Sequence, residues 1–232
     1  MDTASPSDQS NQLKLAVFDC DGTLVDSLHS IVHSMQQACI DHGAPPPASD
    51  AVRRIIGLPL ETAIAGLFPD FDDAAVWDIR EGYRRVFSGL RDKGEVHEPL
   101  YTGAIEALDI LEQDGWLLGV ATGKAHRGLV STLGTHDLEG RFVTLQTADR
   151  AAGKPHPEML HNAMSETGVD AARVVMIGDT TFDMEMAMNA GTMAIGVAWG
   201  YHESNELKES GADIVIDRFG DISDAMTRLM GA

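Results

Sequence analysis

The stretch LAVFDCDGTLVDS at residues 15–27 joins an apolar run to two closely spaced carboxylates. The run is long enough for a buried strand, and it ends at Asp19 and Asp21. Gly22 allows the backbone to turn sharply behind the pair. In a regular strand both carboxylates would point the same way and repel each other without a cation. One interpretation is a simple Asp-Gly turn. The other is a carboxylate nucleophile with a second carboxylate beside it, both near a divalent metal ion.

The segment after this strand is helical in pattern and contains no strand signal up to about residue 95. Apolar residues at helical spacing predict four helices, with Asp26 or Ser27 capping the first. These helices are expected over residues 28–41, 50–56, 60–67 and 74–91. A segment of this kind is best interpreted as an inserted helical domain.

From residue 101 onward, predicted strands alternate with predicted helices. Such alternation is typical of βαβ units and of a parallel sheet covered on both faces. The strands are expected at residues 116–121, 142–145, 174–177, 193–197 and 214–216. We therefore predict an α/β fold, a Rossmann-like parallel sheet with an inserted all-helical domain.

The predicted domains follow from this change of pattern. The sheet domain takes residues 13–26 and 97–232, and the helical domain takes residues 27–96. Residues 1–12 are polar, and we predict a disordered tail there.

The composition narrows the classes of partner and compartment. With 36 acidic against 17 basic residues, the chain has a formal charge of -19, which disfavours nucleic acid as a partner. The two cysteines form no disulfide framework or metal cluster by pattern. No apolar stretch approaches transmembrane length, and residues 1–12 lack the features of a signal peptide. We predict a cytoplasmic protein without a membrane partner, either a monomer or a homodimer.

Candidate phosphate-binding groups follow two of the later strands. Ligands of open parallel sheets bind beyond the carboxyl ends of the strands, so functional residues are expected in the loops at these ends. Thr122 and Gly123 open a helix after the 116–121 strand, where a hydroxyl and free amides can cradle a phosphate. The alternative is a plain N-cap threonine beside a solvated Lys124. Lys154, between a glycine and a proline, can neutralise acids or hold a phosphoryl group, or it is an exposed loop lysine.

A second pair of acids follows the 174–177 strand. Asp179 stands at the strand end and Asp183 lies one helical turn further on, so both can face one point. The alternative is helix capping by Asp179 or a threonine, and a favourable dipole interaction for Asp183. Together with Asp19 and Asp21, these residues form a set of hard oxygen ligands that suits Mg²⁺.

The four motifs in this order resemble the haloacid dehalogenase-like hydrolase superfamily. They are DCDGT at residues 19–23, Thr122, Lys154 and GDTTFD at residues 178–183, and the resemblance spans about residues 14–217. The position of the helical insert is similar to the subfamily with a helical cap, which includes phosphoglycolate phosphatases and β-phosphoglucomutase. The resemblance implies a Rossmann-like core with the first strand central and a mobile cap that closes over the site.

The resemblance also implies a role for each motif residue. Asp19 would be the nucleophile that forms an aspartyl-phosphate, and Asp21 the general acid and then the general base. Gly22, Thr122, the Gly123 amide and Lys154 would hold the phosphoryl group. Mg²⁺ would be bound by Asp19, the carbonyl oxygen of Asp21, Asp179 and Asp183.

The helical insert offers candidates for substrate recognition. Residues 50–95 hold seven bases and nine acids, so this block is nearly neutral in a very acidic chain. Arg53 and Arg54 are our candidates for gripping an anionic substrate, unless they belong to a solvated helix face.

Three functions compete. The first is a Mg²⁺-dependent phosphatase that hydrolyses a small phosphorylated metabolite, phosphoglycolate-like or a sugar phosphate, through an aspartyl-phosphate. The second is a β-phosphoglucomutase-like isomerase with the same core. The third is a non-catalytic, phospho-regulated binding module, which the acid/base position of Asp21 and the large insert disfavour.

Overall fold

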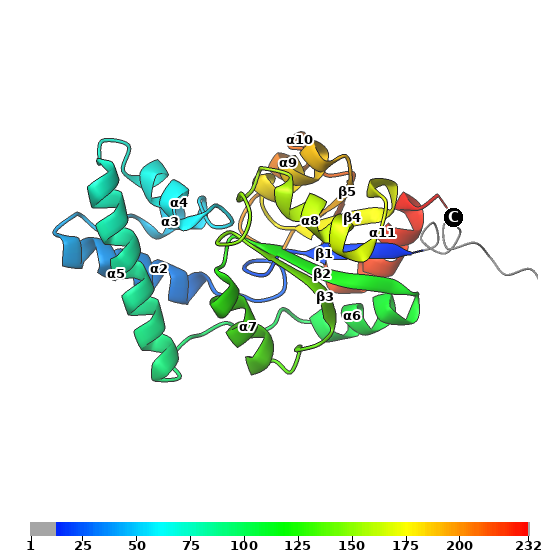
Figure 1. Ribbon diagram of the computed structural model, residues 1–232, viewed down its shortest axis with the longest axis horizontal. Helices are drawn as coiled ribbons and strands as arrows, with labels where there is room; N and C mark the ends of the chain where they lie inside the picture. The colour runs from blue at the N-terminus through cyan, green and yellow to red at the C-terminus, as the bar shows by residue number, and fades with distance from the viewer. Residues whose placement is uncertain (1–12, 232) are drawn as a thin grey trace, which may run out of the picture.

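A six-stranded parallel sheet forms the centre of the molecule (Figure 1), and the computed structural model describes residues 13–231 of the chain. The tail predicted for residues 1–12 therefore lies outside the described residues. The strand order is β3-β2-β1-β4-β5-β6, so β1 is central, as expected. The strands are β1 (Lys14–Phe18), β2 (Trp116–Thr122), β3 (Phe142–Thr147), β4 (Val174–Gly178), β5 (Met193–Val197) and β6 (Ile214–Ile216).

Helices cover both faces of the sheet, which confirms the predicted α/β fold. Along β1, Ala16 and Phe18 face one apolar core, while Leu15 and Val17 face the other. The first core is completed by α6 (Ala104–Gln113), α7 (His126–Thr135) and α11 (Ile222–Leu229). The second is completed by α8 (Glu158–Thr167), α9 (Thr181–Ala190) and α10 (Ser204–Glu209). Short 3₁₀ turns precede β4 and α11, at Ala171–Arg173 and Phe219–Asp221.

The inserted segment forms four helices with an apolar core of their own, which lie beyond one end of the sheet (Figure 1). They are α2 (Leu28–His42), α3 (Ser49–Arg53), α4 (Leu60–Leu67) and α5 (Asp73–Asp92). Residues such as Met35, Val52, Ile64 and Ile79 are buried in this core. Within residues 13–231, no helix combines the length and apolar character needed to cross a bilayer.

Two local predictions in the insert need correction. The helix expected up to residue 56 ends at Arg53, because the chain continues as a turn over residues 54–57 that closes at Gly57 with φ +102°. Ser27 stands at the N-cap position of α2, but its hydroxyl donates to Asp21 rather than capping the helix. Asp26 supplies a weaker contact, accepting from the Leu28 amide at 3.3 Å.

Candidate active site

Asp19 occupies the first position after β1, at the carboxyl edge of the sheet. Its amide donates to the Ile177 carbonyl of β4 at 2.9 Å, so the backbone is still held to the sheet at this point. The chain then turns through Gly22 at φ +89°, and a side chain there would overlap the carboxylate of Asp179. Only glycine allows this approach of the first loop to Asp179.

Three buried carboxylates converge at this edge, as the motif spacing predicted. Asp19, Asp179 and Asp183 each place one carboxylate oxygen within 4.8 Å of the other two. The ammonium of Lys154 lies 2.9 Å from Asp19 Oδ2 and 2.5 Å from Asp183 Oδ1, and its side chain is completely buried. The alternative of an exposed loop lysine is therefore wrong.

The electrostatics of this cluster favour a bound dication. Three carboxylates and one ammonium leave a formal charge of -2 among side chains that are all buried. Burial raises the pKa of Asp19 to about 7, although Lys154 opposes the shift, and burial also raises the pKa of Asp179 well above its usual range. Burial lowers the pKa of Lys154, but Asp183 and Asp19 outweigh it and hold the pKa above its usual range. Oxygen donors with excess negative charge fit Mg²⁺.

Local structure holds the two later carboxylates in place. Asp179 accepts from the Tyr201 amide at 2.9 Å and from the Thr23 hydroxyl at 2.8 Å. Asp183 uses Oδ2 to accept from the amide and hydroxyl of Thr180 in a capping box, which leaves Oδ1 for Lys154. Asp183 therefore stabilises the start of α9 through Oδ2 and belongs to the carboxylate cluster through Oδ1. The two roles considered for it are compatible because each uses a different oxygen.

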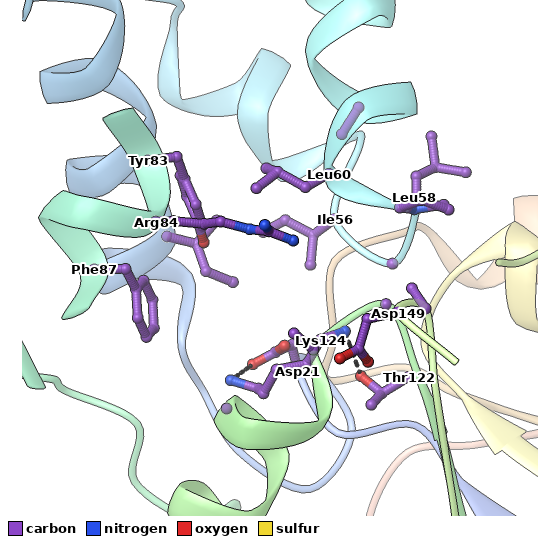
Figure 2. Close-up of a pocket in the computed structure, with 18 of the residues that line it drawn as sticks. Asp21, Ile56, Leu58, Leu60, Tyr83, Arg84, Phe87, Thr122, Lys124 and Asp149 are labelled. Atoms are coloured by element: carbon purple, nitrogen blue, oxygen red, sulfur yellow. Dashed lines mark hydrogen bonds and ion pairs between the residues drawn. The ribbon is translucent and has the colours of Figure 1, made fainter. Parts of the chain in front are cut away.

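Asp21 lies apart from this cluster and has a different set of partners. Its Oδ1 accepts from the Ser27 hydroxyl at 2.5 Å and lies 2.9 Å from the ammonium of Lys124 (Figure 2). Lys124 also lies 3.4 Å from Glu98 Oε2, and its side chain is 9% exposed. The alternative of a solvated Lys124 is therefore wrong. Sequence reasoning missed Glu98 altogether, since no motif connects it to Asp21.

Thr122 and Gly123 follow β2 and lie beside Asp19 and Asp21 on the wall of one cavity. Thr122 is buried, and its Oγ1 accepts from the Lys124 amide at 3.2 Å. A side chain at Gly123 would overlap the carbonyl groups of Gly57 and Leu58. The phosphate-cradle candidate therefore lies directly against the helical insert.

The cavity has a volume of about 670 Å³ and lies between the insert and the carboxyl edge of the sheet (Figure 2). Residues of α2, α4, α5 and the chain between α3 and α4 form its upper wall. Apolar groups alternate there with cations, and sequence reasoning identified none of them. The apolar lining of this wall includes Met35, Ile56, Leu60, Tyr83 and Phe87, and its arginines are Arg80, Arg84 and Arg91, while Arg127 of α7 lines the cavity from the sheet domain.

The structure does not place Arg53 or Arg54 on this wall, in contrast to our expectation. Arg53 donates to the Gly200 carbonyl at 3.1 Å, and Arg54 forms a two-pronged ion pair with Glu206 at 2.6 and 2.7 Å. Both side chains are held by residues that follow β5, and in the chain between α3 and α4 the cavity lining begins at Ile55. Trp199, in the segment after β5, packs against Tyr101 and Phe219.

Comparison with known proteins agrees with this geometry. The family model described as haloacid dehalogenase-like hydrolase matches residues 16–197. The chain is 38% identical over 221 residues to the "Probable phosphatase IndB" of Dickeya dadantii, which covers 93% of this chain and 94% of that protein. It is 30% identical to the N-acetylmuramic acid 6-phosphate phosphatase of Pseudomonas aeruginosa, and the match covers 94% of this chain and 97% of that protein.

The fold has matches among solved structures. A hydrolase from Pseudomonas syringae superposes with a TM-score of 0.82 at 23% identity, over 94% of this chain and 99% of that one. The matched segment of the family runs from β1 through β5 and includes all four motifs. The chain therefore belongs to the haloacid dehalogenase-like hydrolase family.

Proposed function

We propose that the chain is a Mg²⁺-dependent phosphatase that hydrolyses monoesters of small phosphorylated metabolites. The observation that carries the proposal is Asp19, a buried carboxylate held by Lys154 beside two further acids and facing a cavity. The relatives named as phosphatases support it, since they match the chain over almost its whole length.

Asp19 and Asp21 divide the proposed chemistry. An oxygen of Asp19 attacks phosphorus, the ester P–O bond breaks, and Asp21 gives a proton to the departing alkoxide. Asp21 then takes a proton from water, the water oxygen attacks the aspartyl-phosphate, and inorganic phosphate leaves with Asp19 restored. The covalent route replaces one difficult displacement by two easier ones.

The remaining groups hold the phosphoryl oxygens. Thr122 and the Gly123 amide line the cavity at the attack site, the turn at Gly22 lies against Asp179, and Lys154 orients Asp19. Asp19, Asp179 and Asp183, with the Asp21 carbonyl oxygen, would hold Mg²⁺, which offsets charge on the transferring group. We further propose that residues 27–96 act as a cap on the domain formed by residues 13–26 and 97–232, because the insert supplies the upper wall of the cavity.

Removing divalent metal should abolish the activity, and Mg²⁺ should restore it. Without a dication the cluster of Asp19, Asp179 and Asp183 keeps its excess negative charge, which repels a phosphate ester. Phosphate release is measured after EDTA treatment and readdition of Mg²⁺. Binding is measured separately as a rise in melting temperature, because a ligand of the folded state stabilises it. Full turnover in EDTA, or an unchanged melting temperature with Mg²⁺, would contradict the assignment.

The cavity wall points to substrates whose alcohol part carries an acceptor group. Arg84 extends into the cavity between Tyr83 and Ile56, and its ion pair with Glu81 is long, at 3.4 Å (Figure 2). We propose that it contacts the non-reacting end of the substrate. A phosphoglycolate-like carboxylate or a sugar hydroxyl would satisfy it.

Replacing Arg84 by Ala should raise KM for the preferred metabolite about 10-fold or more, as expected for loss of a charge-assisted contact, with kcat less affected. Arg85→Ala is the matched control, because Arg85 is the neighbouring exposed arginine on α5 and does not line the cavity. A metabolite panel that includes 2-phosphoglycolate and β-glucose 1-phosphate is measured for each variant. Equal kinetics for both variants would rule out the contact, and glucose 6-phosphate instead of free phosphate would favour an isomerase.

A further inference from the structure

Two chain segments connect the sheet to the helical insert, and they run side by side. The first covers residues 19–27 and the second covers residues 93–101. The Asp26 amide donates to the Pro99 carbonyl at 2.9 Å, and the Tyr101 amide donates to the Leu24 carbonyl at 3.0 Å. Any movement of the insert relative to the sheet therefore involves both segments.

Lys124, from the loop between β2 and α7, bridges these two segments. Its ammonium lies 2.9 Å from Asp21 Oδ1 on the first segment and 3.4 Å from Glu98 Oε2 on the second. It also lies 5.7 Å from the centre of the Phe87 ring on α5, in cation–π range. One side chain of the sheet domain thus contacts both connections and one helix of the insert.

Glu98 is itself held firmly. Its side chain is buried, and both carboxylate oxygens accept from the Thr132 hydroxyl of α7 at 3.0 Å. Its backbone carbonyl lies 2.8 Å from Nε2 of His136. Glu98 therefore anchors Lys124 from the side opposite Asp21, and the lysine cannot swing freely toward solvent.

The two carboxylate oxygens of Asp21 differ in their contacts with the protein. Both the Ser27 hydroxyl and the Lys124 ammonium use Oδ1. Among residues 13–231, no hydrogen bond reaches Oδ2, while Asp21 contributes to the cavity wall. One oxygen is thus bound to the protein and the other is available to a ligand.

We propose that Lys124, anchored by Glu98, is a positioning residue that orients the carboxyl of Asp21 so that Oδ2 meets the leaving oxygen of the substrate. The inference rests on the proposed phosphatase function and deepens it. Direct binding of phosphate by Lys124 is the competing role. It is disfavoured because two carboxylates already lie within 3.4 Å of the ammonium.

Leaving-group dependence tests this role. An alkyl phosphate needs a proton on its leaving oxygen, whereas p-nitrophenolate leaves without one. Lys124→Met should lower kcat/KM for an alkyl phosphate about 10- to 100-fold, part of the usual contribution of general acid catalysis, and lower it less than about 3-fold for p-nitrophenyl phosphate. Lys124→Arg should recover most of the loss, because it restores a cation at Oδ1. The ratio of the two substrates does not depend on the folded fraction of a preparation.

A second background separates positioning from phosphate binding. If Lys124 acts only through Asp21, adding Lys124→Met to Asp21→Asn should change kcat/KM for the alkyl phosphate less than about 2-fold. Glu98→Gln should reproduce the leaving-group-selective loss in smaller measure. Lys208→Met removes the same charge from an exposed site on α10 and is expected to match the wild type.

The other possible outcomes contradict either the positioning role of Lys124 or the phosphatase function. An equal loss for both substrates with Lys124→Met, or a full effect in the Asp21→Asn background, makes Lys124 a phosphate contact and refutes the positioning role. No loss at all with Lys124→Met also refutes it. A wild-type protein that hydrolyses neither ester with Mg²⁺ refutes the phosphatase function itself.

Discussion

Replacing Asp19 by Asn should reduce phosphate release at least about 10³-fold, the scale seen when a covalent nucleophile is removed. An amide is a poor nucleophile toward phosphorus and cannot form the acyl phosphate. The substitution also removes one of three crowded negative charges beside Lys154, so the metal-free protein should fold at least as stably as the wild type. The effect on rate is therefore chemical and not a consequence of unfolding.

The phosphoenzyme provides an independent measurement. Wild-type protein quenched with acid during turnover should carry phosphate that hydroxylamine removes, and Asp19→Asn should carry none. Asp217→Asn, at an exposed position after β6, serves as the control and should behave as the wild type. Undiminished turnover by Asp19→Asn would end the case for this nucleophile, and a labelled phosphoprotein without turnover would favour a regulatory module.

Replacing Lys154 by Met should cost both activity and stability. Lys154 is the partner of Asp19 and Asp183, and removing it leaves the buried cluster with a formal charge of -3. Breaking a buried ion pair by removing one member typically destabilises a protein by about 3–5 kcal/mol. For a chain of this size that corresponds to a fall in melting temperature of about 6–20 °C. Activity should fall at least about 10²-fold, because Lys154 also orients the nucleophile.

Calorimetry with and without Mg²⁺ measures this effect. A dication compensates part of the lost charge, so saturating Mg²⁺ should raise the melting temperature more for Lys154→Met than for the wild type. Lys208→Met again removes an exposed ammonium and is expected to leave the melting temperature within about 1 °C, as surface substitutions usually do. A melting temperature for Lys154→Met equal to that of the wild type would show that the buried ion pairs do not carry this energy.

The central residues of the site could be predicted from the sequence, because a parallel sheet brings the ends of its strands together. When strands alternate with helices, the strands run parallel and their carboxyl ends lie at one edge of the sheet. Asp19, Thr122 and Asp179 are adjacent to strand ends in the chain, so their convergence follows from the pattern. Asp183 follows from helical spacing after β4. Lys154 lies well after the end of β3, so its local sequence left open whether it reaches the acids or is an exposed loop lysine.

For the inserted segment, only the presence of helices could be predicted from the sequence. Residues 60–67 and 74–91 were correctly predicted as helical, yet the side of each helix that faces the cavity was not apparent from periodicity. Arg84 and Arg54 have the same chemistry and similar local sequence signals. Packing of α5 against α2 directs Arg84 into the cavity, and a salt bridge to α10 removes Arg54 from it.

The chain alone therefore determined the parallel sheet and the acids at its edge, because these depend on local hydrophobic pattern and strand direction, whereas the central place of the first strand was implied by the family resemblance. Tertiary structure decided what surrounds them. Lys124 is a bridge between Asp21 and Glu98 rather than a solvated lysine, and Glu98 lies 77 positions from Asp21 in the chain. Asp21, Lys124 and Glu98 belong to the same domain but come from three separate segments, which only the folding of the sheet brings together, and no local periodicity encodes that contact.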